Sequence, residues 1–328
     1  MKRKLAEHTL NPVGLGCMNV AWAYGNPPAR EDAAALFRHA LDNGCEHFDT
    51  ANIYGGGVSE EILHEAIMGR RQEFFLATKT GIVIDGTRRG VDCSPDAITT
   101  SLDASLKRLG TDHVDLFYMH RFDPKVPIAD SVGAMVRAIE AGKIGAYGVS
   151  EWSAAHIREA HAVHPVAAVQ TEYSLFTRNV ELGVFDTTKD LGIALIAFSP
   201  VGRGALGGKL RDIDTLTEKD LRRTFPRFLA ENWEKNLELI EDFNGLAAEA
   251  GVAPAQLALA WVLSRGDHVH VIPGTRSIAH WAENHESASL AIDAGILARA
   301  GDLINQQTVA GHRYPEMIRP TIDTEDFV

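Results

Sequence analysis

The chain has little cysteine. Its 328 residues include three cysteines, Cys17, Cys45 and Cys93, scattered without CxxC or CxxH spacing. An odd and scattered set argues against a disulfide framework or a zinc site, and it is typical of a reducing compartment.

The sequence also lacks the residue spacings that are typical of metal-binding and dinucleotide-binding motifs. Three of the fourteen histidines, His156, His161 and His164, share one short stretch, but no HExxH or strand-end HxH pattern occurs. A metal-dependent barrel hydrolase or lyase is therefore disfavoured, and we expect no metal. No GxGxxG follows a strand and opens a helix, so a Rossmann site is not indicated.

Long apolar runs are missing as well. No stretch approaches the roughly 20 apolar residues that span a bilayer, and the basic start MKRKLAEHTL lacks the apolar run of a secretory signal. The net charge of -12 provides no overall field that would attract nucleic acid or an acidic membrane. We expect a cytoplasmic protein that binds neither, and any anionic ligand must be held by a local site.

The amino-acid composition is typical of a globular protein, since 45% of the residues are hydrophobic and 23% are charged. No linker, low-complexity segment or repeat divides it, which predicts one domain over 1–328. Short apolar runs of strand character recur at 13–18, 47–51, 74–80, 113–120, 146–151, 167–173, 193–199 and 268–272.

Stretches of helical period separate most of these runs, for example 31–43 and 95–109. Ser94-Pro95 is typical of a helix start, and glycines expected just after helices are Gly44, Gly69, Gly110, Gly142 and Gly192.

About eight alternations of strand and helix predict a closed (β/α)8 TIM barrel, with an open doubly wound sheet as the alternative. The charged segment 202–253 predicts a long loop after the seventh strand, lying over a site and leading into a helix at 231–250.

Four polar residues lie at or just after the ends of predicted strands two to four, where a barrel directs functional groups: Asp49, Tyr54, Lys79 and His120. Singly, each has an ordinary explanation, such as a helix cap or a solvated lysine. Together they indicate one chemistry. An ammonium favours the anion of a phenol, a carboxylate keeps that ammonium charged in a buried site, and a histidine can hydrogen-bond a carbonyl oxygen.

The blocks HFDTANIYGG and VDLFYMH, with Lys79 between them, resemble those of the aldo-keto reductase superfamily. The resemblance extends from VGLGCM near residue 13 to IPGTRSIAHWAEN near 284. It implies a TIM barrel that reduces aldehydes or ketones with NADPH, in which Asp49, Tyr54, Lys79 and His120 are catalytic and Tyr54 is the general acid.

The same resemblance implies the cofactor contacts. Ser150 and Gln170 match residues that bind the nicotinamide carboxamide, and Phe198 matches the aromatic stacked on the ring. The loop after strand seven, folding over the pyrophosphate, would supply Ser199, Val201, Gly202, Arg203 and Lys209. The 2′-phosphate and adenine would contact Gly274, Thr275, Arg276, His280, Glu283 and Asn284.

This chain departs from the family pattern at two positions. Glu151 stands where many members have an asparagine that contacts nicotinamide, and Gly274 stands where some have a lysine. The charge of a 2′-phosphate would therefore be met by Arg276, with His280 beside it, and we expect NADPH to be preferred over NADH. Met18, Trp22 and Tyr24 are candidates for an apolar substrate wall, although large residues at a barrel rim are as often simple packing.

Two functions remain open at this point. The first is a working reductase acting on a small carbonyl compound, and the second is a cofactor-sensing protein like the channel-associated β-subunits of the superfamily. Turnover of a generic aldehyde separates them. The sequence indicates no oligomeric state.

Overall fold

Eight parallel strands form the centre of the molecule in the computed structural model, which describes residues 2–85 and 88–327. In sheet order they are β3 (Leu15–Gly16), β4 (His47–Asp49), β5 (Phe75–Thr80), β8 (Val114–Met119), β9 (Ile144–Ser150), β10 (Ala168–Glu172), β11 (Ala194–Phe198) and β12 (Val269–Ile272). Each of the eight predicted runs contains or overlaps one of these strands.

The sheet closes on itself between its first and last strands. Parallel bridges join Val13 to Val271 and Gly16 to Gly274, and the Gly14 amide donates to the Val271 carbonyl at 2.9 Å. The predicted (β/α)8 barrel is confirmed, and the open-sheet alternative is wrong.

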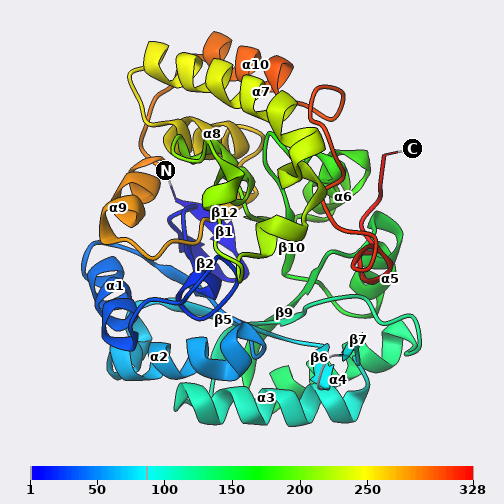
Figure 1. Ribbon diagram of the computed structural model, residues 1–328. Helices are drawn as coiled ribbons and strands as arrows, with labels where there is room; N and C mark the ends of the chain where they lie inside the picture. The colour runs from blue at the N-terminus through cyan, green and yellow to red at the C-terminus, as the bar shows by residue number, and fades with distance from the viewer. Residues whose placement is uncertain (1, 86–87, 328) are drawn as a thin grey trace.

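Helices surround the strands (Figure 1). They are α1 (Arg30–Asp42), α2 (Val58–Ile67), α3 (Pro95–Leu109), α4 (Ile128–Glu140), α5 (Ala154–Val163), α6 (Val184–Leu191), α7 (Ala230–Glu249), α8 (Pro254–Leu263), α9 (Ile278–Glu286) and α10 (Ala294–Leu303). The predicted long segment between β11 and α7 consists of a loop with short 3-10 helices.

Helix ends follow the expected chemistry with one exception. The Ser94 hydroxyl caps α3 by accepting from the Ala97 amide, and Gly44, Gly110, Gly142 and Gly192 all have positive φ. The prediction that Gly69 follows a helix end is wrong. Helix α2 ends at Ile67, and the chain continues into a 3-10 helix, η3 (Met68–Glu73), which contains Gly69.

The inside of the barrel is mostly apolar toward the amino ends of the strands. Residues such as Phe75, Leu116 and Ile196 form a buried cluster with Leu5 and Leu10. Leu5 and Leu10 belong to an N-terminal hairpin, β1 (Arg3–Leu5) and β2 (His8–Leu10), which the sequence did not predict. This cluster fills one end of the barrel, and Asp49, Lys79 and His120 lie at the carboxyl ends of the strands.

Two further parts were not predicted. A second hairpin, β6 (Ile82–Asp85) and β7 (Arg88–Val91), follows the third barrel strand. After α10, the C-terminal segment runs past α6 and α5 (Figure 1).

Within the described ranges, no single helix is both long and apolar enough to cross a membrane. The pair α7 and α8 meets the length and composition criteria only when taken together across an 86° bend.

Candidate active site

The four polar residues predicted at strand ends come together at one mouth of the barrel. Asp49 ends β4, Lys79 lies near the end of β5 and His120 directly follows β8. Tyr54 begins the 3-10 turn η2 (Tyr54–Gly57) after β4. Since β4, β5 and β8 are consecutive parallel strands of the sheet, their carboxyl ends bring these side chains to the same place.

Lys79 is the centre of this group. Its ammonium forms an ion pair with Asp49, donates to the Thr50 carbonyl at 2.7 Å and lies 3.5 Å from the Tyr54 hydroxyl. Lys79 is fully buried and Asp49 is 1% exposed. Asp49 is fixed in turn by Gln170, whose amide donates to the other carboxylate oxygen at 2.8 Å.

Burial and charge compete in setting the protonation of this group. Burial works to lower the pKa of Lys79, but Asp49 and Tyr54 together outweigh it, so the pKa lies above its ordinary value. Burial raises the pKa of Tyr54, and Lys79 is the largest influence in the opposite direction. Tyr54 is therefore protonated at neutral pH beside a charged ammonium, and its hydroxyl has a proton to give.

His120 lies beside the phenol ring. The two ring centroids are 6.1 Å apart and the planes meet at 81°. Both residues line the large cleft of the barrel mouth, and His120 is 6% exposed. A carbonyl oxygen in the cleft can therefore reach both a phenol and an imidazole.

The cleft has a volume of about 440 Å³, which is typical of small-molecule sites. Besides Asp49, Tyr54 and His120, the predicted residues that line it are Met18, Trp22, Tyr24, Gln170, Phe198, Ser199, Val201, Arg203, Lys209, Gly274, Thr275, Arg276, His280, Glu283 and Asn284. Of the predicted residues, Lys79 and Ser150 are buried behind this wall.

Gly202 lies off the cleft wall. It has a φ of 55°, and a Cβ there would meet the Phe176 ring. Gly202 instead shapes the turn after β11, where Ser199 and Arg203 also have positive φ, at 50° and 56°. Backbone strain of this kind persists only where the surrounding structure enforces it, and it gathers at functional sites.

Three predicted basic residues lie on the cleft wall around the start of α9. Lys209 Nζ is 2.8 Å from His280 Nε2, and Arg276 is held by the Asn26 carbonyl at 2.7 Å. The Ser277 hydroxyl caps α9. Basic side chains and a helix start together suit an anion.

The Arg203 side chain is paired with a carboxylate of the protein itself. Its guanidinium pairs with the buried Glu172 at 2.7 Å and lies 4.5 Å above the Phe225 ring and 5.1 Å from that of Tyr314.

Comparison with known proteins decides the family. The aldo/keto reductase family profile matches residues 12–301. The chain is 39% identical to aldo-keto reductase yakc [NADP(+)] of Schizosaccharomyces pombe, over 95% of this chain and 94% of that one. It is 36% identical to aldo-keto reductase str7 of Strobilurus tenacellus, over 99% and 98%.

Solved structures of family members are also similar to this chain. Glycerol dehydrogenase AKR11B4 of Gluconobacter oxydans superimposes with a TM-score of 0.84 at 26% identity, covering 99% of this chain and 97% of its own. An aldo/keto reductase of Klebsiella pneumoniae, in complex with NADP and acetate, gives 0.73 at 25%, over 95% and 98%. The chain belongs to the aldo/keto reductase family. It is thus an oxidoreductase.

In this aldo/keto reductase, Glu151 turns away from the cleft. Its carboxylate accepts from the Glu172 amide at 2.9 Å, pairs with Arg313 at 2.9 Å and accepts from Thr324 at 3.0 Å. Glu151 is fully buried with a φ of 58°. Arg313 and other charges outweigh burial, and they hold the pKa of Glu151 below its usual value.

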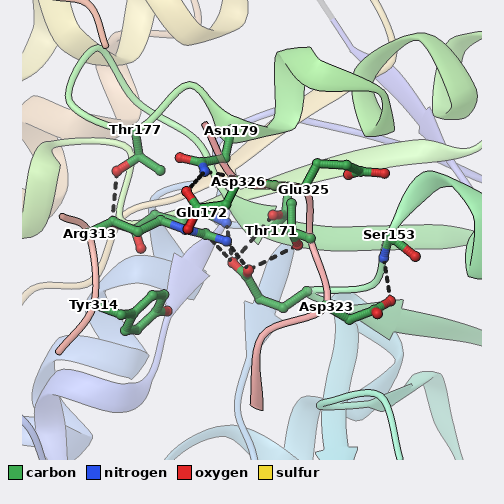
Figure 2. A network of polar contacts seen from close by, with 12 residues as sticks. Ser153, Thr171, Glu172, Thr177, Asn179, Arg313, Tyr314, Asp323, Glu325 and Asp326 are labelled. Carbon is green, nitrogen blue, oxygen red and sulfur yellow. Dashed lines mark hydrogen bonds and ion pairs between the residues drawn. The ribbon is translucent and has the colours of Figure 1, made fainter. Parts of the chain in front are cut away.

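The Glu151 network fastens the C-terminal segment of this reductase to the ends of β9 and β10. Figure 2 shows Arg313, Tyr314 and Asp323 there, with Asp323 accepting from the Ser153 amide at 2.7 Å. Tyr314 consequently forms part of the cleft wall.

Cleft residues missed from the sequence include Arg121, Phe225 and Tyr314. Arg121 had a detectable signal, since it is a charged residue directly after a predicted strand and beside His120. Tyr314 had none, because it reaches the cleft from a tail without helical or strand periodicity.

Within residues 2–85 and 88–327, no three His, Cys, Asp or Glu side chains are placed to hold a metal ion.

Proposed function

We propose that this protein reduces aldehydes or ketones to alcohols with NADPH, and that Tyr54 donates the proton to the carbonyl oxygen. The observation that carries the proposal is the contact of the Lys79 ammonium with both Asp49 and the Tyr54 hydroxyl, at a cleft that His120 also lines.

The roles of the four residues follow from their contacts. Tyr54 and His120 orient the carbonyl by hydrogen bonds to its oxygen. NADPH, when bound, supplies a hydride to the carbonyl carbon. As negative charge develops on the oxygen, Tyr54 gives up its proton, and Lys79 stabilises the phenolate at 3.5 Å. Asp49 keeps Lys79 charged within a site that excludes water.

The cleft fits a dinucleotide phosphate in both polarity and charge. The Ser150 hydroxyl is buried and has no hydrogen-bond partner among the described residues, as expected of a group that awaits a carboxamide. With Gln170 and Phe198 it would hold the nicotinamide, while Arg276, Lys209 and His280 would meet the 2′-phosphate. The names of the yeast and Klebsiella relatives, which mention NADP, support this assignment.

Turnover distinguishes a reductase from a cofactor-sensing protein. We expect NADPH absorbance to fall when a panel of aldehydes and ketones is added, and NADH to be used less well. Tight NADPH binding without oxidation of NADPH by any member of the panel would instead support the sensing protein. We further infer that residues 1–328 act as one barrel domain.

A further inference from the structure

Arg121 is a buried charge that the proposed reaction leaves without a role. It directly follows His120, is 6% exposed and lines the cleft together with Tyr54. Its Nη1 donates to the His120 carbonyl at 2.6 Å, while Nε has no hydrogen-bond partner in the described part of the chain. No carboxylate of the described residues lies within ion-pair distance of it.

The neighbouring acids are already paired. Glu151 is bound by Arg313, and Glu172 is bound by Arg203. The nearby Asp123 accepts from the backbone amides of Cys93 and Lys125 instead. Arg121 acts on the Glu151 carboxylate only at longer range, where it favours the charged form.

The cluster around Arg121 has an excess of positive charge. Arg227 belongs to it through its electrostatic interactions with Glu172, Arg203, Arg313 and Asp326, and burial lowers the pKa of Arg227 to about 10. Four guanidinium groups, those of Arg121, Arg203, Arg227 and Arg313, thus face three carboxylates, those of Glu151, Glu172 and Asp326. An unpaired buried charge is costly unless a ligand compensates it.

Arg121 is the member of this cluster that can meet such a ligand. Arg203 also lines the cleft, but its charge is paired with Glu172. A guanidinium with free N–H groups is well matched to a carboxylate, which it can bind through two parallel hydrogen bonds.

We infer that Arg121 binds an ionised carboxylate on the substrate, and that the preferred substrates of this reductase are aldehydes or ketones carrying a carboxylate a few atoms from the carbonyl. This inference rests on the proposed function. The carbonyl oxygen lies at Tyr54 and His120, and the carboxylate extends to the adjacent Arg121.

The test compares isosteric substrates that differ in charge. The meta and para isomers of carboxybenzaldehyde, in which the two groups cannot close a ring, are assayed against the matching formylbenzamides at saturating NADPH. For at least one isomer we expect the carboxylate to have a kcat/KM at least about tenfold above that of the amide. Arg121→Met should lower that ratio about tenfold or more, Arg121→Gln should act similarly, and Arg121→Lys should retain part of it.

Arg222→Met is the matched control, since Arg222 lines the same cleft but is paired through two contacts with Asp220. It should leave the ratio unchanged. A variant that slows hydride transfer for both substrates equally leaves the ratio of carboxylate to amide kcat/KM unchanged. Circular dichroism verifies that each variant is folded.

Two results would overturn the inference. One is a wild-type ratio near or below unity for every isomer, and the other is a ratio that survives in folded Arg121→Met or Arg121→Gln protein. If the wild type reduces none of these aldehydes, the proposed function fails separately. Calorimetric titration with the hydroxymethylbenzoates and hydroxymethylbenzamides then decides: binding of the carboxylates that depends on Arg121 supports the inference, and its absence refutes it.

Discussion

The ammonium of Lys79 lies 3.5 Å from the hydroxyl of Tyr54, where Lys79 is fully buried and Tyr54 lines the cleft. Lys79 thus has a phenol on one side and Asp49 on the other. Protons on the three groups are coupled, so a change in one residue alters the titration of the others.

Replacing Lys79 by methionine should be at least as harmful to aldehyde reduction as removing the Tyr54 hydroxyl. The variant keeps much of the side-chain volume, but burial then raises the pKa of Tyr54 without the largest of the charges that oppose it. Stopped-flow hydride transfer across pH measures the effect. A folded Lys79→Met protein with an unchanged rate and pH profile would refute the electrostatic role of Lys79.

Asp49→Asn should be milder near neutral pH, because the ammonium remains present. Without Asp49, however, burial lowers the pKa of Lys79. As pH rises, the variant should therefore lose the charged lysine, and with it activity, at a lower pH than the wild type. An alkaline limb that does not move in Asp49→Asn would show that Asp49 does not maintain that charge.

Arg276→Ala should weaken NADPH binding by about tenfold or more and leave NADH binding nearly unchanged. Only NADPH carries a 2′-phosphate, and the variant removes the charge-assisted contact to that phosphate. Fluorescence titration with both cofactors is the measurement. Equal loss for the two would move the discrimination to Lys209 and His280, which contact each other on the same wall.

Most of the barrel could be predicted because its strands are short apolar runs separated by helical periodicity. Three of the four residues proposed as catalytic were readable for a similar reason, since Asp49, Lys79 and His120 lie at or beside strand ends. The carboxyl ends of all strands in a parallel barrel lie at one mouth, so residues at the ends of different strands are close in space.

The parts that could not be predicted depend on contacts between distant, irregular segments. Glu151 and Arg313 are 162 positions apart, and neither spacing nor composition joins them. The strands of the β1–β2 hairpin contain three residues each, too few for any periodicity. Gly69 illustrates the opposite problem, since glycine after an apolar stretch does not reveal whether the helix continues as a 3-10 turn.

Arg313→Met should destabilise the fold by about 3–5 kcal/mol, because it leaves the buried Glu151 carboxylate without its cation. The double variant Glu151→Gln, Arg313→Met should recover part of that loss. Urea unfolding provides the comparison. As a control, removing Arg299 from its exposed pair with Glu249 should leave the midpoint nearly unchanged. A double variant less stable than Arg313→Met would contradict the account of this pair.

Acid should destabilise the protein partly through His47. Burial lowers the pKa of His47 to about 3, so below the ordinary histidine pKa the unfolded chain takes up a proton that the folded chain does not. Stability is therefore lost as pH falls. His47→Leu should reduce the loss between pH 6.5 and 4.5 by about 2 kcal/mol. Equal losses in wild type and variant would mean that His47 is not held neutral.

Single-turnover hydride transfer in Tyr54→Phe measures whether Tyr54 gives its proton to the carbonyl. The enzyme is loaded with NADPH, mixed with an aldehyde and followed by the loss of NADPH absorbance. The rate should fall by about 10²–10⁴, while the Kd for NADPH, from fluorescence titration of the same folded protein, stays close to that of the wild type. A wild-type hydride transfer rate in Tyr54→Phe would contradict the account.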